Sequence, residues 1–358
     1  MLEYLKKRLE NREDVSVVYL GGSITEGAGA SGTEKRWASL TQTWLEKSYP
    51  ESTFTCYNAG IGGTNSEWGV FRLERDVLSH HPNLVFVEFA VNDYQTPYQQ
   101  CLNAMEGIVR RIRSQDRETE IVLVLTAMYK MEEECYSRGE RPESVRIHER
   151  VAARYGLPVI HTGETLLKRI REDRVDPVTY LPDLVHPNDL GYQIYFTVVK
   201  NALEKMLADA GEPQEERAAK LPAPLGDLRY QDARVEDAGK LADTDFRKEA
   251  ISLCGRYTGY ISSDIPGTAG RVEFDGTGIG LYWMIGADSG KLCWSIDGGE
   301  KYVTSSWDTY ALRFDRCNHF MLARELEPGH HVLEFSVADE TEERSKGRFI
   351  RIAAFLIM

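Results

Sequence analysis

A serine on a glycine turn and a histidine close to an aspartate are the residues of this sequence that could carry out chemistry together. Ser23 follows an apolar run and stands in Gly21-Gly22-Ser23. Asp183 precedes His186 by three positions, and in a turn this spacing lets the carboxylate reach the imidazole Nδ1–H. An imidazole held in this way can take the proton of a serine hydroxyl, which then attacks a carbonyl carbon. The residue types therefore favour acyl transfer.

Two loops between these residues could supply hydrogen-bond donors for the negative oxygen of such a reaction. The loop from Asn58 to Ser66 is rich in glycine, and glycines let a backbone approach a ligand closely and aim its N–H groups at it. A later loop contains Asn92, whose side-chain amide is a donor of the kind that an oxyanion hole needs. Each loop also has an ordinary explanation, namely a helix capped by Asn65 or Ser66 and an Asx-turn at Asn92.

The serine turn and the histidine also have simpler explanations when each is taken alone. Gly-Gly-Ser after a strand is an ordinary turn with a helix N-cap. Asp183 and His186 could bind a metal ion, but the sequence offers no obvious third cluster of ligands. We therefore expect no metal and no other cofactor. The four signals gain weight together, because each falls at a strand end or in a loop of one predicted domain.

The elements that must position these residues alternate between two patterns. Short runs that are apolar almost throughout are typical of strands covered on both faces of a parallel sheet. Stretches with apolar residues at helical spacing lie between them. This alternation predicts a three-layer α/β/α domain with a parallel sheet over residues 1–212, with ligands at the carboxyl edge of the sheet. The predicted strands are Val15 to Leu20, Phe54 to Tyr57, Leu84 to Phe89, Ile121 to Leu125 and Pro158 to Ile160.

The remainder of the chain has a different composition. Residues 213–226 are charged and then proline-rich, which predicts a linker. Residues 227–358 contain short alternating runs that are separated by glycine turns, such as Asp297-Gly298-Gly299. This pattern predicts a C-terminal all-β sandwich of jelly-roll type.

Four blocks of the first domain resemble those of the SGNH hydrolase superfamily, the GDSL-like esterases. The resemblance covers about residues 10 to 210 and implies an esterase with the α/β/α fold. Two positions depart from the pattern. Gly22 stands where many relatives carry Asp, and Ala90 stands where many carry Gly, which could change how Asn92 is presented. The matching blocks are Gly21 to Thr25, Asn58 to Thr64, Val91 to Asp93 and Asp183 to His186.

The resemblance also implies a role for each matching position. Ser23 is the nucleophile, His186 is the base that later protonates the leaving alcohol, and Asp183 orients His186. The oxyanion hole is formed by the backbone N–H groups of Ser23 and Gly63 and by the side chain of Asn92. Gly63 is chosen because the oxyanion glycine of the family follows an Ile-x step.

The second half of the chain more loosely resembles the jelly-roll carbohydrate-binding modules that accompany polysaccharide esterases. An SGNH domain followed by such a module resembles the two-domain bacterial mannan O-acetylesterases. It implies acetylated oligosaccharides as the substrate, from mannan first and from xylan next. Trp283 and Trp294 lie in strand patterns and are expected in the core, whereas Trp307 lies in a polar run and could stack on a sugar. Candidate substrate contacts beside the catalytic blocks are Asn65, Trp68 and Tyr94.

Composition and charge limit the other partners. The 358 residues carry a formal net charge of -13, which argues against nucleic acid or an anionic membrane as the main partner. No apolar run approaches the roughly 18 residues that a membrane helix needs. The first residues lack a signal-peptide pattern, so we expect a cytoplasmic protein with reduced cysteines, unless a leader has been removed. A homodimer is left open.

Three functions remain in competition at this point. The first is a carbohydrate O-acetylesterase, and the second is a lipid or thioester acyl hydrolase of the same superfamily. The preferred acyl-chain length separates these two. The third is a sugar-binding protein with an inactive esterase domain, against which the presence of Ser23, Asp183 and His186 argues.

Overall fold

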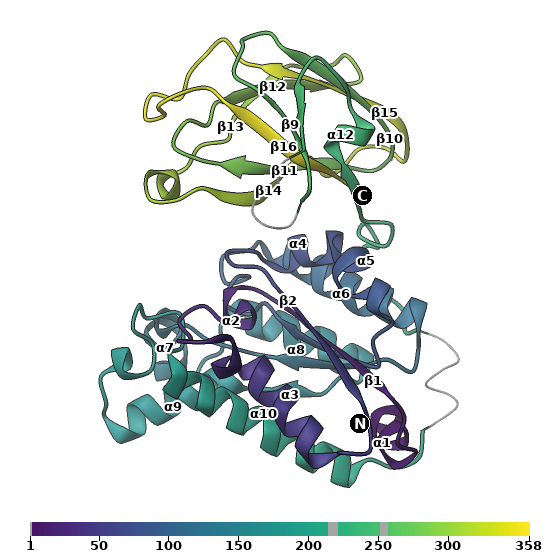
Figure 1. Ribbon diagram of the computed structural model, residues 1–358, viewed down its shortest axis with the longest axis vertical. Helices are drawn as coiled ribbons and strands as arrows, with labels where there is room; N and C mark the ends of the chain where they lie inside the picture. The colour runs from purple at the N-terminus through teal and green to yellow at the C-terminus, as the bar shows by residue number, and fades with distance from the viewer. Residues whose placement is uncertain (1, 214–220, 251–256) are drawn as a thin grey trace. The chain divides into compact units, whose positions relative to one another are not determined.

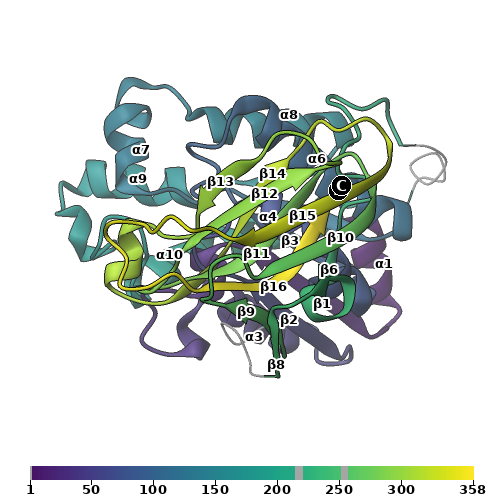
Figure 2. The ribbon, with the colours of Figure 1, turned by 90° about the horizontal axis from the view of Figure 1, so that it is seen from above.

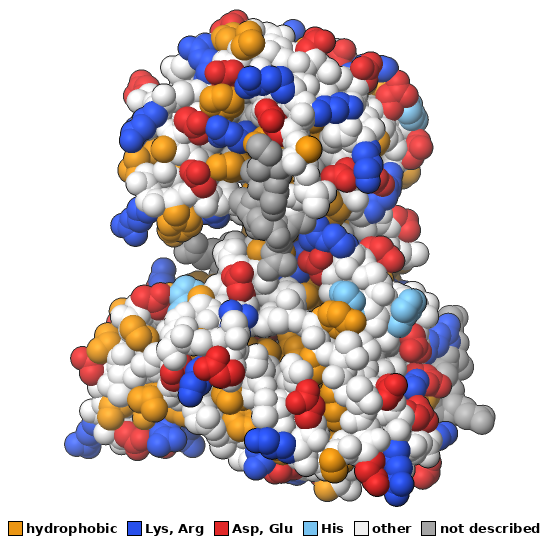
Figure 3. Space-filling model, viewed as in Figure 1, with side chains coloured by type: hydrophobic (Ala, Val, Ile, Leu, Met, Phe, Trp, Pro, Cys, Tyr) orange, Lys and Arg blue, Asp and Glu red, His pale blue; other side chains and the backbone are white. Residues whose placement is uncertain are grey.

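The computed structural model describes residues 2–213, 221–250 and 257–358 (Figure 1). The chain divides into two compact units, Met1–Gln231 and Asp232–Met358. Each unit has its own hydrophobic core. No helix within the described ranges is long and apolar enough to cross a membrane. On the face drawn in Figure 3, acidic and basic side chains are interspersed over both units.

The first unit is built on a five-stranded parallel sheet with the strand order β2-β1-β3-β4-β5. The apolar runs form the strands because alternate side chains are buried on each face. The register pairs Gly21 with Gly60 on one side and with Glu88 on the other, so the first three strands end at the same level. The strands are β1 Val15–Gly21, β2 Phe54–Gly60, β3 Leu84–Glu88, β4 Glu120–Val124 and β5 Val159–Ile160.

Helices cover both faces of this sheet, as the three-layer prediction requires (Figure 1). Tyr19 and Phe86 point to one face, where they pack with Trp37 and Tyr192. Val18 and Val87 point to the opposite face and are also fully buried. The first face is covered by α1 Glu3–Glu10, α3 Trp37–Ser48, α9 Thr162–Asp173 and α10 Asp189–Asp209, and the second by α4 Ser66–Phe71, α6 Tyr98–Gln115 and α8 Glu143–Tyr155.

Shorter elements connect these layers. The helical turn α2 directly follows β1 and lies at the carboxyl edge of the sheet, where the predicted site residues converge. The short elements of the first unit are α2 Ser23–Glu26, η1 Thr33–Lys35, α5 Leu73–Asp76, η2 Leu78–His80, α7 Tyr129–Glu134, η3 Tyr136–Arg138 and η4 Pro177–Thr179.

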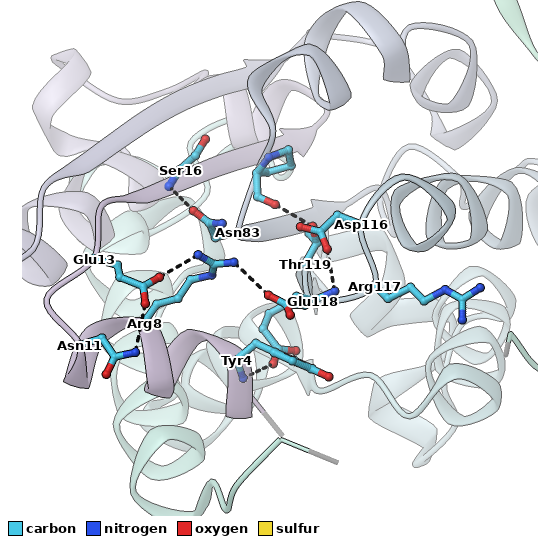
Figure 4. A network of polar contacts seen from close by, with 12 residues as sticks. Tyr4, Arg8, Asn11, Glu13, Ser16, Asn83, Asp116, Arg117, Glu118 and Thr119 are labelled. Atoms are coloured by element: carbon cyan, nitrogen blue, oxygen red, sulfur yellow. Dashed lines mark hydrogen bonds and ion pairs between the residues drawn. The ribbon is translucent and has the colours of Figure 1, made fainter. Parts of the chain in front are cut away.

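Polar contacts close the opposite, amino-terminal edge of the sheet (Figure 4). Arg8 of α1 pairs with Glu13 at 2.9 Å and with Glu118 at 3.0 Å. The backbone N–H of Ser16 donates to the Asn83 side chain at 2.8 Å. Partly exposed ion pairs of this kind contribute little to the free energy of unfolding. These contacts are structural, and the candidate catalytic residues lie at the opposite, carboxyl ends of the strands.

The described part of the expected linker packs on the first unit. The N–H groups of Leu225 and Gly226 donate to the Glu106 carboxylate at 2.7 and 2.8 Å. The Tyr230 hydroxyl donates to Glu67 at 2.5 Å. The first unit extends to Gln231, whereas the first domain was expected to end at 212 and the linker at 226. Residues 214–220 of the expected linker lie outside the described residues.

The second unit is an antiparallel all-β sandwich, as predicted. One sheet has the order β13-β12-β15-β10-β7, and Figure 2 shows β12, β15 and β10 side by side. The other has the order β14-β11-β16-β9-β8, with β6 paired to β16. Trp283 and Trp294 lie in the core between the sheets. The elements are β6 Arg234–Asp237, α12 Ala238–Leu241, β7 Asp243–Thr244, β8 Arg247–Glu249, β9 Tyr260–Ser263, β10 Ala269–Gly276, β11 Ile279–Ile285, β12 Lys291–Ile296, β13 Tyr302–Ser305, η5 Thr309–Leu312, β14 Arg316–Ala323, β15 Gly329–Val337 and β16 Ile350–Ile357.

The cysteines differ from the expectation at one position. Cys317 is disulfide-bonded, so the expectation that every cysteine is reduced is wrong there. Cys254 lies outside the described residues. Stable disulfides are rare in the cytosol, because thioredoxin and glutathione keep thiols reduced. The cytoplasmic location stays a prediction. The free cysteines are Cys56, Cys101, Cys135 and Cys293.

Candidate active site

The turn that carries Ser23 is built on two glycines at the end of β1. Ser23 is the first residue of α2. A Cβ on Gly21 would lie 2.3 Å from Thr25 Oγ1 and 2.8 Å from the Glu88 carbonyl oxygen. A Cβ on Gly22 would lie 2.0 Å from Asn92 Oδ1. All three distances are far below normal contact, so only glycine lets the turn approach its neighbours this closely.

A buried arginine ties this turn to the next strand. The Arg72 side chain is fully buried, and its guanidinium donates to the Ala59 carbonyl at 2.6 Å and to the Gly21 carbonyl at 3.0 Å. It also pairs with Asp76 at 2.8 Å. Burial raises the pKa of Asp76, but the hydrogen bonds and charges of Arg75 and Arg72 outweigh it and hold that pKa below its ordinary value. One side chain therefore fixes the carboxyl ends of β1 and β2 together.

His186 lies against Ser23 and is held by Asp183. His186 Nε2 is 2.8 Å from Ser23 Oγ, and His186 Nδ1 is 2.6 Å from Asp183 Oδ2. The other carboxylate oxygen of Asp183 accepts the backbone N–H groups of Val185 and His186. Burial raises the pKa of Asp183, but the hydrogen bonds from His186 and the backbone outweigh it and hold that pKa below its ordinary value. The sequence spacing therefore produces a carboxylate that stays ionised next to the imidazole.

The backbone between Asp183 and His186 is strained at one residue. Leu184 has a φ of 66°, in the left-handed region that a residue with a Cβ rarely adopts. The strain costs on the order of 1 kcal/mol. It lets the chain fold back so that the carboxylate and the imidazole of the same turn meet. Nothing in the residue type of Leu184 predicts this conformation.

The structure brings Asn92 to the Ser23 turn and leaves the Gly63 N–H available. The Asn92 amide lies against the Gly22 backbone, next to Ser23. In the glycine loop, the N–H of Gly60 donates to Asn58 at 2.9 Å and the N–H of Gly62 donates to Glu26 at 2.8 Å. Gly63 has a φ of 70°, and none of the hydrogen bonds found among the described residues comes from its N–H. These facts agree with Gly63 and Asn92 as free donors.

The candidate substrate contacts near Ser23 have mixed outcomes. Asn65 caps α4 by accepting the Trp68 N–H at 3.3 Å, and its amide donates to Thr96 at 3.2 Å. Trp68 is fully buried, so the expectation that it lines the site is wrong. It belongs to the apolar face of α4. Tyr94 is half-buried, its hydroxyl donates to Glu134, and burial together with this carboxylate raises the pKa of Tyr94 to about 12.

Trp307 of the second unit is also a core residue. It is only 7% exposed and packs in the core between the sheets, with the Arg344 guanidinium 4.4 Å from its ring centre. The expectation that it is exposed for a sugar is therefore wrong. The polar residues around Trp307 suggested an exposed loop, but Ser306 turns inward and donates to the Gly290 carbonyl. Tyr310, three residues further on, is 54% exposed.

Two buried groups near the site were missed by the sequence analysis. The first is Glu88, at the end of β3, which accepts the hydroxyls of Thr25 at 2.9 Å and Thr126 at 2.6 Å. Burial raises the pKa of Glu88 to about 7, although hydrogen bonds from Thr126, Thr25 and the turn backbone oppose the rise. An acidic residue at the end of the apolar run Val85-Phe86-Val87 was the signal that could have revealed it.

The second missed group is a buried cluster directly behind Asn92. Asp93 lies 2.8 Å from His148 Nε2 and accepts the N–H and hydroxyl of Ser66. One potential metal-ligand atom from each of Asp93, His148 and Cys101 lies within 4.8 Å of the other two. Asp93 and His148 hydrogen-bond each other, and burial raises the pKa of the Cys101 thiol well above its usual range. The hydrogen bonds of Asp93 with Ser66 and His148 form a network that fixes the residue after Asn92.

Comparison with known proteins identifies the class of this site. Residues 19–194 match the model of the GDSL-like lipase/acylhydrolase family. The match supports an ester hydrolase, and the second unit of the chain is all-β. No curated protein matches the sequence.

Two solved structures resemble the whole chain. One is a two-domain esterase (CEX) active on acetylated mannans, with 24% identity and a TM-score of 0.85, over 100% of this chain and 95% of that chain. The other is a two-domain esterase (CEX) active on acetylated mannans and co-crystallised with mannopentaose. It has 25% identity and a TM-score of 0.85, over 99% of this chain and 94% of that chain.

Proposed function

We propose that the chain is a serine esterase that removes O-acetyl groups from plant polysaccharide-derived oligosaccharides, from mannan first and from xylan next. The observation that carries this proposal is the line of contacts from Ser23 Oγ to His186 Nε2 at 2.8 Å and from His186 Nδ1 to Asp183 at 2.6 Å. A hydroxyl, an imidazole and a carboxylate in this order are what acyl transfer by a serine requires.

In the proposed mechanism, Ser23 Oγ attacks the acetyl carbonyl while His186 takes its proton. The tetrahedral intermediate collapses when His186 passes that proton to the sugar oxygen, which leaves as an alcohol. A water molecule then loses a proton to His186 and attacks the acetyl-serine, which releases acetate and restores Ser23. Asp183 holds the ring and stabilises the imidazolium that forms in each half.

The negative oxygen of both intermediates needs donors that are already in place. We assign this role to the backbone N–H groups of Ser23 and Gly63 and to the Asn92 amide. Two facts support the assignment: the Asn92 amide lies against the turn of Ser23, and the neighbouring glycine N–H groups of Gly60 and Gly62 are occupied elsewhere. Donors that are already in place need no reorganisation when the oxyanion forms.

The substrate proposal rests on the likeness that extends over both units. The structure that is 25% identical over 99% of this chain is of an esterase active on acetylated mannans. The net charge of -13 also suits a neutral sugar better than an anionic one. Nucleic acid and membranes are therefore not the proposed partners, and no observation favours a particular oligomeric state.

We assign carbohydrate binding to the second unit. Tyr310 replaces Trp307 as the aromatic candidate, because it is exposed and the Arg316 guanidinium lies 5.1 Å from its ring centre. An exposed ring held in place by a neighbouring cation can stack on a sugar face at low entropic cost.

The test is product mapping by NMR after incubation with acetylated manno- and xylo-oligosaccharides, with Ser23→Ala as the control. Release of acetate from the mannan fragments by the wild type alone supports the proposal. A preference for aryl octanoate over aryl acetate would overturn the sugar-ester substrate in favour of a lipid or thioester. Identical behaviour of the wild type and Ser23→Ala on aryl acetate would instead favour a sugar-binding protein.

A further inference from the structure

Glu88 lies directly beneath the turn that carries Ser23. It is the last residue of β3 and is fully buried. In the sheet register it stands opposite Gly21, the residue that leads into the turn. Four donors face its carboxylate: the hydroxyls of Thr25 and Thr126 and the backbone N–H groups of Gly22 and Thr25.

Three of these four donors belong to the turn itself. The N–H groups of Gly22 and Thr25 and the Thr25 hydroxyl flank Ser23 on both sides along the chain. Ser23 is the first residue of a short helix, where backbone N–H groups have no partner within the helix. A carboxylate that accepts the neighbouring donors fixes the turn and leaves the Ser23 N–H for another acceptor.

We propose that Glu88 is a positioning residue of the esterase site, whose ionised carboxylate holds the Ser23 turn in the geometry that binds the oxyanion. This inference rests on the proposed function and adds a residue to it. Glu88 does not touch the substrate and acts through the backbone on either side of Ser23.

The charge of Glu88 matters because only the carboxylate accepts from all four donors. A protonated carboxyl must donate its own proton, so one of the four contacts is lost or reversed. Burial raises the pKa of Glu88 to about 7, so this change falls within the range where esterases are assayed. The titratable side chains that face Glu88 are Tyr192 and Tyr195 of α10, and burial raises the pKa of each well above 10. Both stay neutral, so Glu88 is the group that titrates there.

The expected effect of Glu88 on stability is opposite to its effect on activity. The pKa of Glu88 is about 7 in the folded protein against an ordinary value of 4.5, so the folded state binds the proton more tightly. The free energy of unfolding therefore falls as the pH rises from 4.5 to 7, and above pH 7 the ionised carboxylate destabilises the folded state. A neutral glutamine of the same shape removes this destabilisation.

The experiment compares Glu88→Gln with Glu106→Gln as a matched control. Glu106 is also a buried glutamate that accepts two backbone N–H groups and a tyrosine hydroxyl, but it lies on α6 beneath residues 225–226. We expect Glu88→Gln to lower kcat for aryl acetate about 10- to 100-fold at pH 8, as small misplacements of reacting groups do. KM should stay unchanged, and the difference in kcat between Glu88→Gln and the wild type should shrink below pH 6. Its melting temperature at pH 8 should equal or exceed that of the wild type.

Several results would overturn the inference. These are a wild-type kcat for Glu88→Gln at every pH, a deficit that does not change with pH, or the same kinetic change in Glu106→Gln. If Glu88→Gln fails to fold, Thr126→Val replaces it. The Thr126 hydroxyl lowers the pKa of Glu88, so its loss should raise that pKa and move the acid limb of the pH profile of kcat to higher pH. An acid limb that does not move counts against the proposal.

A second readout separates this inference from the proposed function. The rate at which a fluorophosphonate labels Ser23 depends on the same turn but needs no ester substrate. If the wild type is labelled quickly but hydrolyses no acetyl ester, the substrate proposal fails and the comparison of Glu88→Gln with the wild type can still be made. Equal labelling rates at pH 8 would overturn the role of Glu88.

Discussion

The two halves of the candidate catalytic site are held in opposite ways. The Ser23 turn is fixed from below by buried groups of distant segments, namely Arg72 and Glu88. The His186 turn is fixed from within, by contacts of Asp183 with Val185 and His186. The Asp183 side chain is 58% exposed, whereas Arg72 and Glu88 are fully buried.

This difference suggests how the two halves respond to change. A group held by buried long-range contacts cannot be altered without affecting the core around it. A local turn at the surface can lose its function while the fold remains intact. We therefore expect changes at Asp183 to alter activity and leave stability unchanged. Changes beneath Ser23 should alter both, in opposite directions at Glu88.

The largest effect is expected for Ser23→Ala. Loss of the proposed nucleophile should lower kcat on the order of 10⁶-fold, as it does in a serine protease with a Ser-His-Asp triad. The melting temperature should stay within a few degrees of the wild type, because only one hydroxyl is removed. Steady-state hydrolysis of aryl acetate measures kcat, and thermal denaturation measures the melting temperature. A variant that retains a tenth of the activity would show that another group attacks the ester.

The next largest effect is expected for Asp183→Asn, which tests the surface half. The amide cannot stabilise the imidazolium or hold the correct tautomer of His186, so kcat should fall about 10⁴-fold. Because Asp183 is exposed and its turn is local, the free energy of unfolding should change by less than about 1 kcal/mol. A large loss of stability would contradict the contrast between the two turns.

Asn92→Ala should have a smaller effect. Removal of one oxyanion donor typically costs about 10²- to 10³-fold in kcat, with little change in KM. The neighbouring network of Asp93 and His148 stays in place, so the fold should be retained. An increase in KM alone would mean that Asn92 binds the substrate rather than the transition state.

Gly22→Ala should have the smallest effect of the four. Its Cβ would lie 2.0 Å from Asn92 Oδ1, so the amide must move and kcat should fall about 10-fold or more. Gly211→Ala is the control, because a Cβ there meets nothing within 4 Å. Wild-type activity of Gly22→Ala would show that the Asn92 amide can leave its position without loss.

The sequence predicted the part of the site that depends on local order. The parallel sheet follows from runs buried on both faces, and Asp183 and His186 meet because they stand three positions apart in a turn. Glu88 and the buried position of Trp68 were missed, because both depend on what packs against them from distant segments. Trp307 was misjudged for the same reason, since hydroxyls that bond inward make a buried run resemble a polar loop.

The strained, exposed turn at Leu184 has a consequence for the response of the enzyme to heat. Segments held by few buried contacts open locally at a lower free-energy cost than global unfolding. The His186 turn should therefore exchange its amide hydrogens faster than the Ser23 turn. Warming should then separate the base from the nucleophile before the sheet melts, and activity lost in this way should return on cooling.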